Sequence, residues 1–187
     1  LNAAFRDPAV RAVVTTRGGA GAYRILDGID GEAVRRDPKP LVGFSDITYV
    51  HLALWGQCRL PGVHGCVVGP RAIASVHRLL MTGEPSVLHR DAGSYTAPLS
   101  TTGTAEGFLM GGSLTAVACM VGAGLPSLDG AILVLPDSDP RIVGRLSTNI
   151  HSTIANDAAL DPTERKPVMG VGAPSYSSGV HLWNGAI

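Results

Sequence analysis

Apolar residues in the first half of the chain alternate between short β-branched runs and stretches with helical spacing. The run over 10–16 stops at the glycine-containing stretch 17–19, a pattern typical of a buried strand that ends in a tight turn. A short helix is expected over 22–29, and the two prolines within 37–40 separate it from the next element. The first residues of the chain are also predicted to be part of a helix.

The next apolar run leads into a helix without any linker. A strand is predicted over 41–44 and a helix over 46–55, in which Ile47, Val50 and Leu54 fall on one face. A further strand is expected from residue 63 to residue 68, followed by a helix from residue 71 to residue 81. Because strands and helices alternate, the pattern predicts an α/β protein with a parallel sheet and crossover helices.

The composition changes after residue 90, where a stretch rich in Ser, Thr, Gly and Pro begins. We therefore predict an N-terminal α/β domain over 1–90, a linker over 91–105 and a smaller C-terminal α/β domain over 106–187. The C-terminal domain is expected to contain strands over 107–110, 131–135 and 167–171 and a helix over 113–121.

Charge and composition narrow the function classes. The 187 residues include 15 Lys and Arg against 15 Asp and Glu, so the even balance argues against a nucleic-acid partner. A hydrophobic content of 45% is enough for a real core and excludes wholesale disorder. No apolar run approaches the roughly 20 residues that span a bilayer, so no membrane partner is expected.

The cysteines indicate neither a disulfide framework nor a zinc site. Cys58, Cys66 and Cys119 are an odd set and none belongs to a Cys-x-x-Cys pair. We expect three buried or half-buried free thiols, no metal or other cofactor, and a reducing cytoplasm as the compartment.

A serine stands where a predicted strand turns directly into a predicted helix. In the stretch Gly-Phe-Ser-Asp, Ser45 would project from the carboxyl edge of the sheet, where α/β proteins place their sites. The amides that follow it, beginning with that of Asp46, belong to a helix N-terminus and are able to bind an oxyanion. Two interpretations stay open on local grounds: Ser45 is a nucleophile, or it merely caps the helix.

The glycine-rich stretch after the first strand is a second candidate. Gly18 and Gly19 would let backbone amides approach an anion or a substrate closely. Arg24 stands where a dinucleotide-binding fingerprint needs its third glycine, so that motif is incomplete. The alternative is a tight turn that only closes the strand.

Several motifs taken together resemble one family. The segments AFRDPAVRAVVTTRGGAGAYRIL, KPLVGFSDITYVHLAL and GVHGCVVG occur in this order, followed by EGFLMGGSLTAVACMVG, LDGAILVLPD and PVMGVGAPSYSSGVHLWNGA. They are similar to the LD-carboxypeptidases, the serine peptidases of muropeptide recycling, which have the microcin C immunity peptidases as relatives. The resemblance covers most of the chain.

The resemblance implies a two-domain α/β protein with a Ser-His-Glu triad that cuts an amide bond before a D-amino acid. Ser45 would be the nucleophile, and the amide of Asp46, with that of Gly18 or Gly19, would form the oxyanion hole. No metal or cofactor, a small peptide substrate or ligand, and a homodimer are also implied. Substrate-contact positions carry over to Arg17, His64, Gly111, Gly112 and Ser113.

Two triad positions do not match the family. Pro136 stands where the acid is expected and Ser175 where the histidine is expected. A shifted loop would let His181 replace the base, with Asp137 orienting it. Without a base, a serine of this kind loses on the order of 10⁶ in kcat, so a catalytically silent paralogue that binds a muropeptide or peptide-nucleotide is an alternative. An amidase of the microcin C immunity type is another.

The family pattern is also longer than this sequence. Strands that precede AFRDP in the family are missing, and only 138–166 separates the acid region from the histidine region. We therefore expect a partial chain, a decayed paralogue, or both. His51, next to the apolar face of its helix, is expected to be a packed or partly exposed helix residue.

Overall fold

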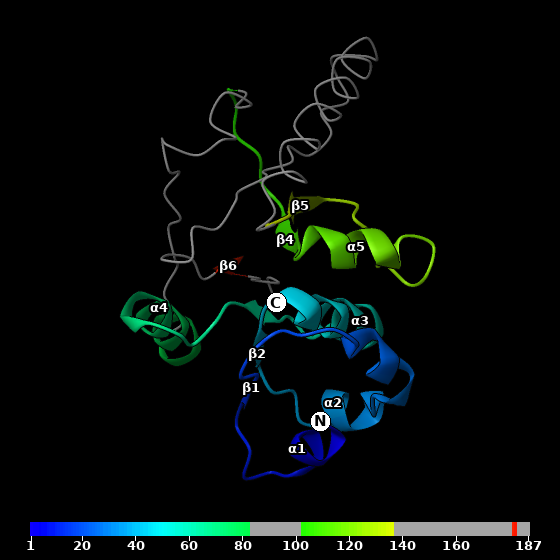
Figure 1. The fold of residues 1–187 in the computed structure, drawn as a ribbon, viewed down its shortest axis with the longest axis vertical. Helices are drawn as coiled ribbons and strands as arrows, with labels where there is room; N and C mark the ends of the chain where they lie inside the picture. Colours follow the sequence, from blue (N-terminus) through cyan, green and yellow to red (C-terminus); the bar gives the residue numbers. More distant parts are fainter. Residues whose placement is uncertain (83–101, 137–180, 183–187) are drawn as a thin grey trace.

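The computed structural model describes residues 1–82, 102–136 and 181–182 (Figure 1). Its first part contains α1 (Asn2–Arg6), β1 (Val13–Val14), the 3₁₀ helix η1 (Ala22–Gly28), α2 (Gly31–Arg36), β2 (Leu41–Gly43), the 3₁₀ helix η2 (Ser45–Ile47), α3 (Thr48–Cys58), β3 (Val63–His64) and α4 (Pro70–Met81). The remaining described elements are β4 (Phe108–Gly111), α5 (Leu114–Met120), β5 (Ala131–Val134) and β6 (His181–Leu182).

The strands form two sheets. The larger has the order β1-β2-β3-β6, in which the first two pairs are parallel and β6 runs antiparallel to β3. The smaller sheet is the parallel pair β4-β5. The prediction of an α/β chain with parallel strands and crossover helices is therefore confirmed, while the antiparallel strand β6 was not predicted.

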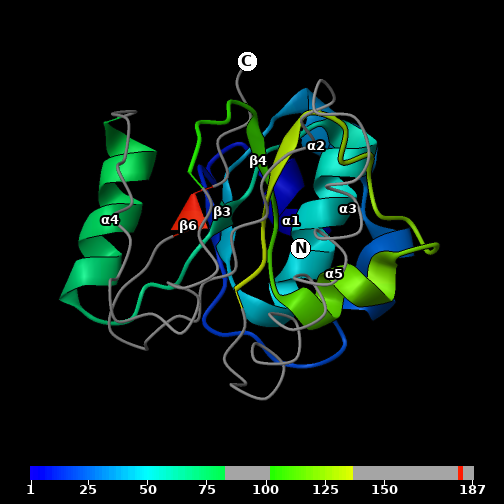
Figure 2. The same ribbon diagram turned by 90° about the horizontal axis from the view of Figure 1, so that it is seen from above.

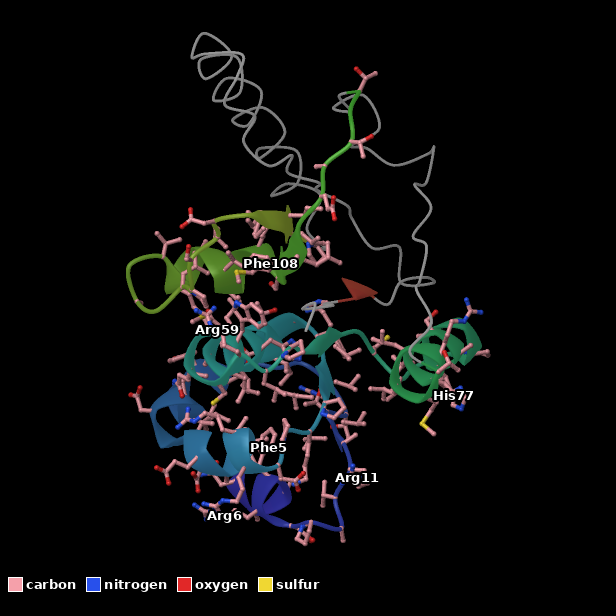
Figure 3. The ribbon with its side chains drawn as sticks, turned by 180° about the vertical axis from the view of Figure 1, so that it is seen from behind. Phe5, Arg6, Arg11, Arg59, His77 and Phe108 are labelled. Carbon is pink, nitrogen blue, oxygen red and sulfur yellow. The ribbon has the colours of Figure 1, made fainter. Side chains whose placement is uncertain are left out.

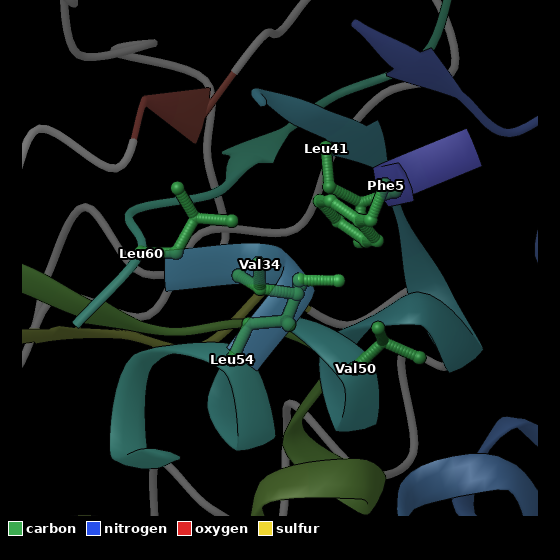
Figure 4. Packing of buried hydrophobic residues seen from close by; sticks show 7 residues of the cluster. Phe5, Val34, Leu41, Val50, Leu54 and Leu60 are labelled. Atoms are coloured by element: carbon green, nitrogen blue, oxygen red, sulfur yellow. The ribbon is translucent and has the colours of Figure 1, made fainter. Parts of the chain in front are cut away.

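Helices cover both faces of the larger sheet, with α4 on one side of the strands and α2 and α3 on the other (Figures 1 and 2). Successive residues of a strand point to opposite faces, and β2 shows this directly. Leu41 packs into a cluster with Phe5, Val50 and Leu54 (Figure 4), whereas Val42 joins Val63 and Val76 against α4. The predicted apolar face of the 46–55 helix is thus confirmed at Val50 and Leu54.

A second hydrophobic core lies on the other side of α3. Leu52 is fully buried with Met110 of β4, Val117 and Met120 of α5, and Ala131 of β5. At the rim of this core the Trp55 ring lies 5.6 Å from the ring of Phe108, which faces the end of α3 in Figure 3. Helix α3 is therefore enclosed between two cores rather than lying on a surface.

Several elements differ from the prediction. The 10–16 run pairs only at Val13–Val14, and Val14 is 46% exposed because β1 is the edge of the sheet and has a neighbour on one side only. The 63–68 strand is limited to Val63–His64, and the 22–29 helix is a 3₁₀ helix. Helix α2, whose N-cap Asp30 accepts a hydrogen bond from the Ala33 amide, was not predicted.

The domain division remains a prediction. Residues 91–101 of the predicted linker and the strand predicted at 167–171 lie outside the described residues. Within the described residues, the segment 106–136 packs directly on α3 through Leu52.

The cysteines, the possible metal ligands and the helices add three observations. In the described residues all three cysteines are free thiols; Cys58 and Cys66 are half-buried, but Cys119 is exposed, which corrects the prediction for that residue. Across the described ranges there is no cluster of three or more His, Cys, Asp or Glu side chains with metal-binding geometry. Among the described helices, none has the length and apolar character needed to cross a membrane.

Candidate functional site

Ser45 occupies a strained strand-to-helix turn. Strand β2 ends at Gly43, and Ser45 adopts a φ of 57°, in the left-handed region that costs a non-glycine residue about 1–3 kcal/mol. Among the described residues only Arg59, just after α3, shares a positive φ without being glycine. The Ser45 side chain is exposed at this turn.

The geometry rules out the alternative that Ser45 is a helix cap. The residue in the N-cap position of η2 is Phe44, and that of α3 is Ile47. Neither helix has a side-chain capping hydrogen bond at its start. The capping interpretation is therefore wrong, because Ser45 is the first residue inside η2 and not the residue before it.

Gly43 makes the tight turn sterically feasible. A Cβ atom on Gly43 would lie 2.6 Å from Ile47 Cγ2 and 2.6 Å from Thr15 Oγ1. Thr15 belongs to the segment just after β1, where its amide and its hydroxyl both donate to the carbonyl oxygen of Val42, at 2.9 and 3.1 Å. The absence of a side chain at Gly43 thus lets Thr15, just after β1, and Ile47, just after Ser45, both pack closely against the Gly43 backbone.

The predicted oxyanion loop reaches the serine. A Cβ on Gly18 would lie 2.7 Å from Ser45 Cβ and 3.1 Å from Ser45 Oγ, so only glycine fits there. At Gly19 a Cβ would meet nothing within 4 Å. Arg17 is exposed at the start of this loop. The structure therefore brings Gly18 and Ser45, two of the predicted residues, into direct contact.

Asp46 connects the same loop to the helix that follows Ser45. Its Oδ2 accepts a hydrogen bond of 2.8 Å from the amide of Ala22, the first residue of η1. Sequence reasoning considered only the backbone amide of Asp46 and missed this contact. No local pattern signals it, because the two residues are 24 positions apart.

Tyr49 lies in the first turn of α3, three residues after Asp46. Its ring packs edge-on against the Tyr23 ring, with centroids 5.7 Å apart. The pKa of Tyr49 is raised to about 12, chiefly by a hydrogen bond with the Cys119 side chain, then by burial and by nearby negative charge that includes Asp46. Tyr49 therefore stays protonated at neutral pH.

The predicted contact residues after β4 also approach the Ser45 turn. Gly111 and Gly112 have positive φ values of 133° and 125°. A Cβ on Gly112 would lie 2.5 Å from the Thr48 side chain, and the Ser113 amide donates to Thr48 Oγ1 at 3.0 Å. Because Thr48 begins α3, this glycine turn packs against the helix at a position three residues after Ser45.

Two buried histidines lie behind the turn. His51 in α3 donates from Nε2 to the Leu41 carbonyl oxygen at 3.1 Å, and its ring centroid is 6.1 Å from that of His64 in β3. Burial lowers the pKa of His51 to about 4, so the ring is neutral at pH 7. His51 is thus a packed residue, as expected, and His64 is 5% exposed, which suits the scaffold better than direct substrate contact.

The remaining triad positions are only partly described. Pro136, at the position expected for the acid, is buried just after β5, and its carbonyl oxygen accepts a hydrogen bond from the Leu114 amide at 3.4 Å. Asp137 and Ser175 lie outside the described residues. His181 is described as part of β6, where its Cα pairs with that of His64, which in turn pairs with Gly43.

The arrangement suits addition to a carbonyl group. An exposed hydroxyl at a sharp turn has the first amides of a helix on one side and a glycine-rich backbone segment on the other. Backbone amides converging on one point stabilise the negative charge that develops on a carbonyl oxygen under attack. The described residues therefore offer an exposed hydroxyl close to backbone amides, the groups that such an addition would use.

Comparison with known proteins agrees with this geometry. Residues 1–65 match the family model described as the LD-carboxypeptidase N-terminal domain. The murein tetrapeptide carboxypeptidase of Pseudomonas aeruginosa is 37% identical over 156 residues, covering 73% of this chain and 48% of that protein. The probable murein peptide carboxypeptidase of Bacillus subtilis is 33% identical, with 74% and 46% covered. The chain thus spans about half the length of these relatives.

Solved structures of similar fold agree with this result. The muramoyltetrapeptide carboxypeptidase from Oxalobacter formigenes superposes with a TM-score of 0.65 at 25% identity, covering 81% of this chain and 53% of that one. The microcin C7 self-immunity protein MccF, in complex with aspartyl sulfamoyl adenosine, gives a TM-score of 0.63 at 19% identity, covering 83% and 57%. By sequence and by fold, the chain belongs to the LD-carboxypeptidase family.

Proposed function

We propose that this chain is a serine hydrolase that cleaves an amide bond next to a D-amino acid in murein-derived peptides, with Ser45 as the nucleophile. The observation that carries the proposal is the left-handed conformation of Ser45 at a strand-to-helix turn with Gly18 packed against its side chain. A conformation that costs free energy at a residue with an exposed hydroxyl is typical of a functional position. The resemblance to the murein tetrapeptide carboxypeptidase of Pseudomonas aeruginosa supports the substrate class.

In the proposed reaction, Ser45 Oγ attacks the carbonyl carbon of the scissile amide and its proton passes to a base. The amides of Asp46 and of Gly18 or Gly19 hold the oxyanion. Collapse of the tetrahedral intermediate breaks the C–N bond, and the D-amino acid leaves with the proton from the base. Water then hydrolyses the ester on Ser45 and regenerates the hydroxyl.

We propose His181 as the base and Asp137 as its orienting acid. The pairing of β6 with β3 supports His181, because the backbone register runs from His181 through His64 to Gly43, two residues before Ser45. His51 does not suit this role, since it is buried and engaged with the Leu41 carbonyl oxygen.

A second candidate function is binding without cleavage. Pro136 favours it, because a buried proline at the position of the triad acid has no carboxylate to orient an imidazole. In this alternative the same turn and glycine loop would hold a muropeptide or a peptide-nucleotide ligand. The MccF complex with aspartyl sulfamoyl adenosine suggests the nucleotide form, which would also be the substrate of an immunity-type amidase.

The cellular setting follows from the proposed substrate. Cleavage of murein-derived peptides belongs to peptidoglycan recycling, for which we propose a cytoplasmic homodimer. The free thiols in the described residues are compatible with a reducing compartment.

The decisive experiment combines covalent labelling with product analysis. A fluorophosphonate probe should label the wild type and the control Ser127→Ala, which alters an exposed loop serine, but not Ser45→Ala. An L,D-tetrapeptide should release its terminal D-amino acid, measured by chromatography, with aspartyl sulfamoyl adenosine as a parallel substrate. Cleavage of the nucleotide alone would favour the amidase. Binding of the tetrapeptide with neither labelling nor cleavage would establish the silent alternative.

A further inference from the structure

The carboxylate of Asp46 has no part in the reaction as written above, although it contacts the predicted oxyanion loop. We infer that this carboxylate is a positioning group that fixes the glycine loop over 17–21 beside Ser45. The inference rests on the proposed function for its effect on rate, but the contact itself is a feature of the fold.

The glycine loop is anchored at its two ends. Before the loop, the Thr15 amide and hydroxyl donate to the Val42 carbonyl oxygen, which joins the chain leaving β1 to β2. After the loop, the Ala22 amide donates to Asp46 Oδ2 at 2.8 Å. Gly18 lies between these anchors and is in contact with Ser45. The second anchor is therefore set by the residue next to the nucleophile.

The physical reason for such an anchor is the loop's own freedom. Glycines lose more conformational entropy on ordering than any other residue, so a loop with Gly18, Gly19 and Gly21 needs an external constraint. A hydrogen bond to an ionised carboxylate is roughly twice as strong as one between neutral groups. The carboxylate also meets the first amide of η1, where a negative charge is favourable.

Precision in this loop bears directly on catalysis. An oxyanion donor works only within about 2.7–3.1 Å of the developing charge, and a misplacement of about 1 Å costs as much as 10²-fold. Asp46 thus has two separate roles: its backbone amide is a proposed donor, and its side chain sets the position of the opposing donor loop. The charge strengthens this second role, but a neutral amide oxygen at the same place also accepts from Ala22 and keeps most of it.

This separation provides the test. Asp46→Ala should lower kcat for the tetrapeptide by about 10- to 100-fold with KM changed less than about threefold. Asp46→Asn, which keeps the acceptor oxygen, should restore kcat to within about fivefold of the wild type. Asp27→Ala, which removes an exposed carboxylate within η1, is the matched control and should retain wild-type kinetics.

Amide hydrogen exchange gives a readout that does not depend on activity. Exchange at Ala22 and through the glycine loop should accelerate in Asp46→Ala and stay near wild type in Asp46→Asn. Unchanged exchange in Asp46→Ala, or an Asp46→Asn variant as slow as Asp46→Ala, would overturn the inference. A wild type that neither labels nor cleaves would overturn the proposed function, while faster Ala22 exchange in Asp46→Ala would still support the anchor.

Discussion

Two of the turns that lead from a parallel strand to a helix in the described residues end in a serine. In the first, between β2 and α3, the positive φ falls on Ser45 itself. In the second, between β4 and α5, the positive φ values fall on Gly111 and Gly112, and Ser113 has an ordinary φ of −47°. The same change of direction is thus achieved with strain on a serine at one turn and on glycines at the other.

The difference indicates which turn is built for its side chain. Glycine adopts a left-handed φ without steric cost, so a turn under no functional constraint is expected to use it. The strained serine is therefore consistent with the proposed role of its hydroxyl. The turn before α5 instead serves packing, since Gly112 fits against Thr48 and the Ser113 amide bonds to its hydroxyl.

The largest expected effect comes from adding a methyl group to the packing turn. In Gly111→Ala, the new Cβ would lie 1.9 Å from the Val134 carbonyl oxygen, and the φ of 133° adds backbone strain. Separating β4 from β5 should lower the free energy of unfolding by on the order of 4 kcal/mol. Urea denaturation followed by circular dichroism measures this loss.

Gly122→Ala is the matched control for that prediction. Its φ of 75° is also positive, but a Cβ there meets nothing within 4 Å. It should cost only the backbone strain of about 1–2 kcal/mol. Equal losses in the two variants would show that close packing at Gly111 does not matter, which would break the contrast between the turns.

The second prediction concerns acid and depends on His51, which lies close to the first turn. The folded-state pKa of His51, about 4, lies below its ordinary value of 6.5, so the unfolded chain binds the proton more readily. Stability should therefore fall as pH drops from 6.5 towards 4, by about 2 kcal/mol between pH 7 and pH 5. The segment 102–136 contains no histidine. Urea denaturation at pH 7 and pH 5 measures the loss of stability.

A His51→Gln variant tests the assignment, because glutamine can still donate to the Leu41 carbonyl oxygen but does not titrate in this range. The variant should lose most of the pH dependence between 7 and 5. If the dependence persists unchanged, it arises from groups other than His51.

The smallest expected effect comes from exchanging each serine for glycine. Ser45→Gly relieves the left-handed strain and should stabilise the fold by up to about 1 kcal/mol, while removing the proposed nucleophile. Ser113→Gly relieves no strain and should cost about 0.5–1 kcal/mol. Thermal unfolding of the two variants gives the sign of each change. A loss of stability in Ser45→Gly would contradict the view that the serine is strained.

The sequence predicts the alternation of strands and helices, because the signal is local. The apolar face of α3 at Val50 and Leu54 is visible as helical spacing. The turn at Ser45 is visible as a direct change from a strand pattern to a helix pattern. The second buried face of α3 was missed, since Leu52 packs against Met110 and Val117, more than 50 residues further along the chain. Long-range partners of this kind leave no local periodicity.

The candidate site can likewise be predicted from the sequence only where its signals are local. Its position at the carboxyl end of β2 follows from the order of elements, and the glycines of the loop are visible as a motif. Rejecting the capping interpretation required the bounds of η2 and α3, because a cap and a nucleophile turn fit the same residues. The bond from the Ala22 amide to Asp46 depends on how two distant segments meet and has no sequence signal. The short α2 was missed although its cap, Asp30, was available as a signal.

The enclosure of α3 has a consequence for how the molecule comes apart. From Thr48 to Leu54 every residue except Tyr49 is buried, with Val50 and Leu54 in one core and Leu52 in the other. Neither core can open without exposing one side of this helix to water, so residues 1–82 and 102–136 should unfold in a single cooperative transition. In such a transition the turn that carries Ser45 opens only when both cores open. A substitution that destabilises either core therefore also destabilises this turn.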